Sequence, residues 1–141
     1  MPAFARVEDI DVWRESRVLA STVYRQTSQG PWSRDWGLRD QIRRAVVSIP
    51  CNIAEGYARE THAEFNRFLA IGRGSANEAK TQMYIAPDLE YVDQETFDGF
   101  YKHIDRICRM LTGLMDYLKS PAAKLRQPST ANRQPPTTGS K

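Results

Sequence analysis

Apolar residues recur at three- and four-residue steps along most of the chain, which is the pattern of helices that bury one side. Turn-forming residues interrupt this pattern at regular intervals. The pattern predicts four successive helices, over about residues 9–29, 35–58, 61–87 and 93–119. Because short connections between long helices favour antiparallel neighbours, we expect residues 1–120 to form an all-α, up-down-up-down four-helix bundle.

The inward positions of each helix follow from the same spacing. In the first helix they are Ile10, Trp13, Ala20, Val23 and Tyr24, and in the second Leu38, Ile42, Ala45, Val46, Ile49 and Ile53. In the third they are Phe65, Phe68, Leu69, Gly72, Ala76, Ala79 and Met83, and in the fourth Phe97, Phe100, Ile104, Ile107, Leu111, Leu114 and Leu118. Asp9 and Asp93 are candidate helix caps, and Thr61 with Glu64 forms a capping-box sequence.

The second helix is apolar on a second side as well. Val47, Cys51, Ala54 and Ala58 form a stripe that lies roughly opposite the inward positions. A helix with two apolar sides requires two partners, one inside its own subunit and one outside it. We therefore expect these four residues, together with Arg43, to contact another copy of the chain.

A proline interrupts the same helix, which glycine 56 is expected to close. Pro50 has no N–H to donate to the Val46 carbonyl, and its ring presses on the preceding turn, at a cost of about 3 kcal/mol unless it is relieved. Ser48 or Asn52 is placed to supply compensating hydrogen bonds. We expect Pro50 to curve the helix around the core, or to redirect its end.

The net charge of the chain gives little evidence about function once the charged residues are located along the sequence. The chain carries a net charge of +3, but the segment from Pro121 onward carries +4 and the first 120 residues therefore −1. Residues 121–141 form a basic tail rich in proline, serine and threonine, which is expected to be irregular and disordered. Overall basicity is thus weak evidence for nucleic-acid binding, and only a local patch would support it.

Arginines are the strongest candidates for such a patch, namely Arg39, Arg43, Arg44, Arg59, Arg67 and Arg73. The alternative is ordinary pairing on a solvated helix, through Asp35–Arg39, Asp40–Arg44 and Glu55–Arg59 at i,i+4 spacing. Arg43 has no such acidic partner, so a subunit interface or an anion is its expected contact. Trp32 and Trp36 either plug one end of the bundle or stack on a partner.

The cysteines, the histidines and the glycine-rich segment do not match the pattern of a known catalytic, metal or phosphate site. Cys51 and Cys108 have no metal-ligand spacing, and His62 and His103 are expected to be exposed. The glycine run at residues 72–77 sits within a helix and follows no strand, unlike a phosphate-binding loop. We expect no enzymatic activity, cofactor or metal, and a cytoplasmic location, because no leader or membrane-spanning stretch is evident.

Several motifs resemble those of small bacterial four-helix-bundle proteins encoded within intervening sequences of 23S ribosomal RNA genes. They are Ile10-Asp11-Val12-Trp13, residues 41–50, Asn52-Ile53-Ala54-Glu55-Gly56, residues 64–69, and Gly74-Ser75-Ala76 with Glu78. The resemblance covers about residues 4–119. It implies a homopentameric ring without an established enzymatic activity. The fold is also similar to that of the accessory variability determinant of retroelements, which forms a basic ring and works with nucleic acid. This chain departs from that relative because its first 120 residues are nearly neutral.

These observations lead to two functional hypotheses. The first is a non-enzymatic, homo-oligomeric scaffold or adaptor, pentameric by the resemblance. The alternative is a nucleic-acid-binding accessory protein that acts with an RNA- or DNA-processing partner through the arginines and the cationic tail.

Overall fold

The structure is a computed structural model that describes residues 4–121. Its helices are η1 (Val7–Asp9), α1 (Asp11–Gln26), η2 (Gly30–Arg34), α2 (Trp36–Tyr57), α3 (His62–Asp88) and α4 (Gln94–Lys119), where η marks a short 3-10 helix. The described residues contain no strand. The predicted boundaries of the last three long helices are confirmed to within a few residues. The expected tail falls almost entirely outside the described residues.

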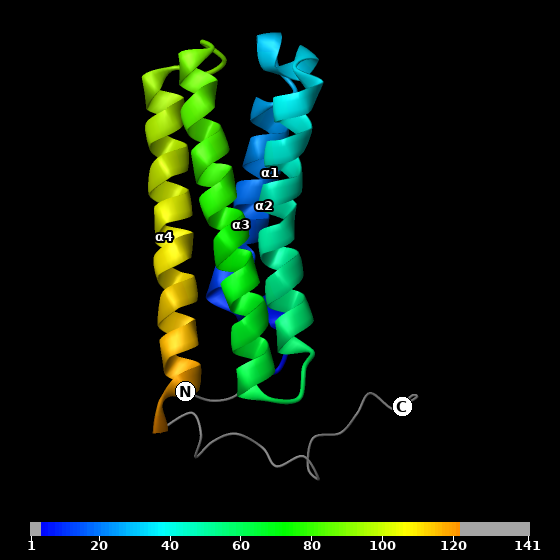
Figure 1. The fold of residues 1–141 in the computed structure, drawn as a ribbon, viewed down its shortest axis with the longest axis vertical. Helices are drawn as coiled ribbons and strands as arrows, with labels where there is room; N and C mark the ends of the chain where they lie inside the picture. Colours follow the sequence, from blue (N-terminus) through cyan, green and yellow to red (C-terminus); the bar gives the residue numbers. More distant parts are fainter. Residues whose placement is uncertain (1–3, 122–141) are drawn as a thin grey trace, which may run out of the picture.

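The chain reverses direction at each connection, so that α1 and α3 run opposite to α2 and α4 (Figure 1). Each long helix packs against the next, and α1 also contacts α4, which closes the arrangement into a bundle. The contact between α2 and α3 is the most extensive and that between α1 and α4 the least. The predicted up-down-up-down bundle is therefore confirmed.

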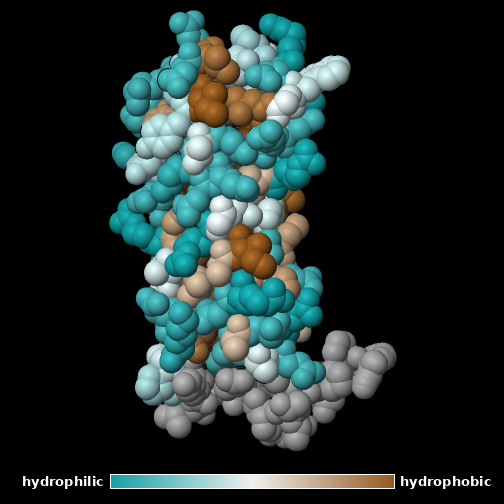
Figure 2. Space-filling view, in the orientation of Figure 1, coloured by the Kyte–Doolittle hydropathy of each residue, from teal (hydrophilic) through white to brown (hydrophobic). Residues whose placement is uncertain are grey.

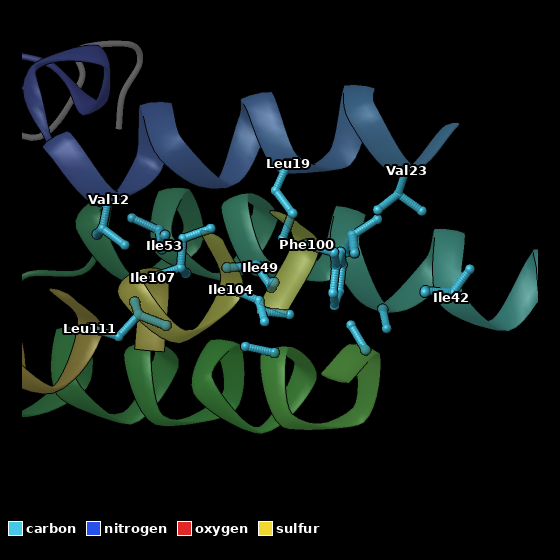
Figure 3. Close-up of a cluster of buried hydrophobic side chains, with 14 of the residues drawn as sticks. Val12, Leu19, Val23, Ile42, Ile49, Ile53, Phe100, Ile104, Ile107 and Leu111 are labelled. Carbon is cyan, nitrogen blue, oxygen red and sulfur yellow. The ribbon is translucent and has the colours of Figure 1, made fainter. Parts of the chain in front are cut away.

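The core lies along the bundle axis, where side chains from different helices point toward one another (Figure 3). Ile42, Ile49 and Ile53 of α2 are completely buried there. In α1 the sequence pattern misplaced part of the stripe: Tyr24 is 43% exposed, while Val12 and Leu19 are buried. The buried residues of α1 are Val12, Ser16, Leu19 and Val23. Because Ser16 is polar, an apolar pattern alone does not identify this stripe.

Helix caps define the ends of the bundle. Asp35, Thr61 and Asp93 accept hydrogen bonds from the backbone N–H groups three residues later, at 3.1, 3.1 and 2.8 Å. The prediction for Asp9 is wrong, because this residue lies in η1 and α1 begins two residues later. The Glu64 carboxylate does not complete a capping box but pairs with Arg67 at 3.3 Å.

The helix α2 continues through Pro50 without interruption. The Asn52 amide donates hydrogen bonds to the Ser48 carbonyl oxygen at 2.8 Å and to the Ser48 hydroxyl at 2.9 Å. The same hydroxyl forms a hydrogen bond of 2.8 Å with that of Ser75 on α3. Ser48 and Asn52 thus link the turn before Pro50 to the neighbouring helix.

Glycine 56 serves close packing rather than helix termination. It is buried within α2, where a Cβ atom would lie 2.8 Å from the Phe68 Cβ and 2.9 Å from the Phe65 Cδ1. The absence of a side chain lets α2 and α3 approach each other just before their connection. Within the described residues, no helix combines the length and apolarity that crossing a bilayer requires.

Candidate functional site

The second apolar stripe of α2 faces away from the core. We call Val47, Cys51, Ala54 and Ala58 the outer α2 face. Val47 is 38% exposed, Cys51 and Ala58 are exposed, and Ala54 is half-buried. The other side of α2 is fully occupied by the core. Residues 4–121 therefore leave the second apolar side of this helix partly open to solvent.

A polar groove of about 340 Å³ runs beside this face, between α2 and α3. Its lining combines one cation and one anion with small and amide side chains, namely Gln41, Arg44, Ala45, Ser48, Ser75, Glu78 and Gln82. The hydrogen-bonded hydroxyls of Ser48 and Ser75 lie in it. The Gln82 Oε1 atom is buried and accepts no hydrogen bond from residues 4–121. The groove offers hydrogen-bonding groups directly beside an apolar helix face.

Arg43 is held by its own chain. Its Nε donates to the Thr27 hydroxyl at 2.8 Å, and its Nη2 donates to the Ser28 hydroxyl at 3.0 Å and the Tyr24 carbonyl at 3.4 Å. The guanidinium also lies 4.4 Å from the centre of the Tyr24 ring. Neutral oxygens at the C-terminal end of α1 thus bind Arg43 within its own chain, and its expected contact with a subunit interface or an anion stays a prediction.

The other candidate arginines are distributed over different parts of the bundle. Arg39 pairs with Asp40 at 3.1 Å instead of with Asp35, and exposed Arg44 lies beside the groove. Arg73 donates to the Thr112 hydroxyl at 3.0 Å, between α3 and α4.

Arg59 and Arg67 lie near the connection between α2 and α3. The predicted pairing of Glu55 with Arg59 is confirmed at 2.6 Å. Arg59 and Arg67 both pack on the Phe68 ring, at 4.8 and 4.6 Å from its centre. The six arginines therefore do not form one continuous patch.

Trp32 and Trp36 have different environments. Trp32 is completely buried and stacks on Tyr91, with ring centres 5.8 Å apart, so it plugs one end of the bundle as expected. Trp36 is 68% exposed, and the plug interpretation is wrong for it.

Exposed apolar side chains on α3 escaped the sequence reasoning, which considered only the inward positions of this helix. Ile71, Tyr84 and Ile85 are 43%, 51% and 42% exposed, and Leu89, which follows α3, is 49% exposed. Figure 2 shows hydrophobic surface on this side of the molecule in two places, at the upper end and lower down, with hydrophilic surface between them. The signal for these residues was their apolarity at positions where the helical pattern predicts polar ones.

Titratable groups interact mainly between helices and at caps. The Tyr91 hydroxyl bonds to the Asp35 carboxylate, which lowers the pKa of Asp35 and raises that of Tyr91. His103 is half-buried, contrary to expectation, and its Nε2 lies 2.8 Å from the Glu15 carboxylate on α1. In the part of the chain that the structure describes, no group of three or more histidine, cysteine and acidic side chains is placed to hold a metal ion.

Comparisons with known proteins agree with this architecture. A solved structure with the same fold is a protein with unknown function from the S23 ribosomal protein family of Bacteroides thetaiotaomicron VPI-5482. It superposes with a TM-score of 0.68 at 22% identity, over 74% of this chain and 97% of the other. No curated protein matches the sequence. The family model of the 23S rRNA-intervening sequence protein matches residues 8–113, and the chain therefore belongs to this family.

Proposed function

We propose that the chain assembles with copies of itself through the outer α2 face and acts as a non-enzymatic scaffold or adaptor. The observation that carries this proposal is the second apolar side of α2, which residues 4–121 leave partly open to solvent. Its alanines and Cys51 are small, so the backbone of a neighbouring helix has room to come close. The resemblance of the motifs to pentameric bundles supports a ring of five copies.

The groove beside the outer α2 face supports the same proposal. A stable contact between protein chains buries about 1,200–2,000 Å² and combines an apolar centre with hydrogen bonds at its margin. Val47 and Cys51 would supply the apolar centre, and Glu78 and Gln82 the polar margin. The buried Gln82 oxygen would gain the hydrogen bond that the described residues do not supply.

Native mass spectrometry of the full chain at micromolar concentration tests the proposal. We expect an oligomer for the natural sequence and a shift to the monomer for the double variant Val47→Glu with Cys51→Glu. Gly113→Glu on α4 is the control for an added charge, because Gly113 is exposed and a Cβ atom there would meet no atom within 4 Å. A natural protein that remains a 16.1 kDa species would refute self-association.

A second candidate function is nucleic-acid binding with a processing partner. The observation in its favour is that Arg39, Arg43 and Arg44 lie along the N-terminal half of α2, near exposed Trp36. The logarithm of the affinity for RNA and DNA should then fall linearly with the logarithm of the salt concentration. Absence of binding at low salt, by the full chain and by a chain truncated after Lys119, would exclude this function.

A further inference from the structure

One end of the bundle carries a basic segment. Residues 25–44, which form the end of α1, the connection η2 and the start of α2, contain five arginines and two aspartates. Arg25, Arg34 and Arg44 are exposed, and none of them takes part in an ion pair with another described residue. Trp36, the most exposed of the large apolar side chains described, lies in the same segment. We call residues 25–44 the basic end segment.

The end of α3 and the start of α4 carry the opposite charge. Residues 81–101 contain no lysine or arginine and five acidic residues, namely Asp88, Glu90, Asp93, Glu95 and Asp98. All five are exposed, and none pairs with a basic side chain elsewhere in residues 4–121. Tyr84, Ile85 and Leu89 add exposed apolar surface to this segment. We call residues 81–101 the acidic end segment.

The two segments lie at the same end of the bundle but on different sides of it. In Figure 1 the connection between α3 and α4 occupies one side of the upper end, and the connection between α1 and α2 the other. Within one chain the two segments touch through Tyr91, which stacks on Trp32 and bonds to Asp35, and through Gln82, which donates to the Gln41 side chain at 3.4 Å. Their exposed charges and apolar side chains remain available on the outside.

We propose that the basic end segment of one copy binds the acidic end segment of the next copy. This inference rests on the proposed self-association and specifies its geometry. Rotation about an axis parallel to the helices keeps both segments at the same height, so each copy presents a basic side to one neighbour and an acidic side to the other. Such a contact joins two different surfaces, and contacts of this kind close into rings.

The surfaces match in apolarity as well as in charge. Trp36 is a large exposed aromatic side chain of the type that dominates the energy of protein interfaces, and Ile85 and Leu89 are exposed on the acidic side. Opposite charges around such a contact accelerate association and exclude wrong orientations. A second copy fits this end better than a nucleic acid does, because the acidic end segment would repel phosphates close to the arginines.

Charge reversal tests the contact. The variant Arg34→Glu with Arg44→Glu and the variant Asp88→Lys with Glu90→Lys should each weaken self-association at least about tenfold near physiological salt. Lys119→Glu and Asp116→Lys, on exposed positions near the opposite end, are the matched controls. Thermal unfolding of each variant checks that it is folded, and sedimentation velocity measures its assembly.

Mixing the two reversed variants provides the decisive measurement. At the exchanged positions one variant then carries carboxylates on both sides and the other carries cations on both sides, so the two variants should associate with each other where each variant alone does not. Assembly of the natural chain that neither reversal affects would overturn this contact but leave self-association through the outer α2 face intact. A monomeric natural chain would remove both. Loss of RNA binding in the Arg34→Glu and Arg44→Glu variant, with assembly unchanged, would assign these arginines to nucleic acid and also overturn the contact.

Discussion

The hydroxyl of Tyr91 donates a hydrogen bond of 2.7 Å to the carboxylate of Asp35, across 56 residues of sequence. Asp35 also accepts the hydrogen bond from the Leu38 N–H that caps α2. One carboxylate thus joins the start of α2 to the connection between α3 and α4. Stacking of Tyr91 on buried Trp32 strengthens the same junction.

Substitution of Tyr91 by phenylalanine should remove part of the acid sensitivity of the bundle. The hydrogen bonds from Tyr91 and Leu38 lower the pKa of Asp35 from its ordinary value of 3.8. Their stabilising effect is therefore complete above that value and is lost as the pH falls through the lowered value of the folded state. In Tyr91→Phe the pKa of Asp35 moves back toward 3.8, so less of this stabilisation exists to be lost.

Acid and thermal unfolding followed by circular dichroism measure this effect. We expect Tyr91→Phe to lower the melting temperature at pH 7 and to leave a smaller difference between pH 7 and pH 3 than the natural chain shows. Asp93, whose pKa is lowered by its cap bonds to Thr96, contributes the same acid sensitivity in both proteins. An unchanged difference between the two pH values would show that the Tyr91–Asp35 bond does not contribute.

Gly56→Ala should destabilise the bundle. The added methyl group would lie 2.8 Å from the Phe68 Cβ and 3.1 Å from the Phe65 carbonyl oxygen, so α2 and α3 would have to separate. Overpacking of this kind costs about 1–3 kcal/mol in the free energy of unfolding. Urea unfolding measures the change.

Gly74→Ala is the matched control, because this glycine lies inside α3 and an added methyl group would meet no atom within 4 Å. There alanine should stabilise the helix by about 0.5–1 kcal/mol. Effects of the same sign at both positions would contradict the proposed reason.

Arg43→Ala should destabilise the junction of α1 and α2. The substitution removes the hydrogen bonds to Thr27, Ser28 and Tyr24, and Thr27 is completely buried. We expect a loss of about 1–2 kcal/mol. Lysine should restore little of it, because an ammonium lacks the planar fork that binds several oxygens and stacks on Tyr24.

Arg44→Ala is the control for Arg43→Ala. Arg44 is the next residue, is exposed and forms no ion pair within residues 4–121. This substitution should change the free energy of unfolding by less than about 0.5 kcal/mol. Equal losses from the two alanine substitutions would refute the structural role of Arg43.

The two cysteines should react at different rates with a thiol reagent. Cys51 is exposed, whereas Cys108 is half-buried and burial raises the pKa of its thiol. Because the thiolate is the reactive form, iodoacetamide at about pH 8 should modify Cys51 at least about tenfold faster. Mass spectrometry of digested protein identifies each site, and Cys51→Ser should remove only the fast phase.

The same measurement reports on assembly. If copies cover the outer α2 face, the rate at Cys51 should fall as protein concentration rises, while the rate at Cys108 stays constant. Constant rates at both cysteines over the concentration range of assembly would place the interface elsewhere on the chain.

Local sequence determined the helices and most of their ends. The apolar steps of α2 and α4 and the caps at Thr61 and Asp93 act over a few residues, so periodicity and capping preferences were sufficient to find them. The stripe Val47, Cys51, Ala54 and Ala58 was also readable, because its residues share one side of a single helix. What covers that stripe stays a prediction.

Tertiary structure alone decided which distant groups meet. Arg43 binds the end of α1, Tyr91 binds Asp35, and His103 lies against Glu15, and none of these pairs has a local signal. The packing of the helices also places the six candidate arginines on different parts of the bundle. It brings the basic end segment and the acidic end segment to the same end. The physical reason is that helical periodicity fixes which side of a helix is buried, whereas the partner of a surface side chain depends on how the helices rotate and pack against one another.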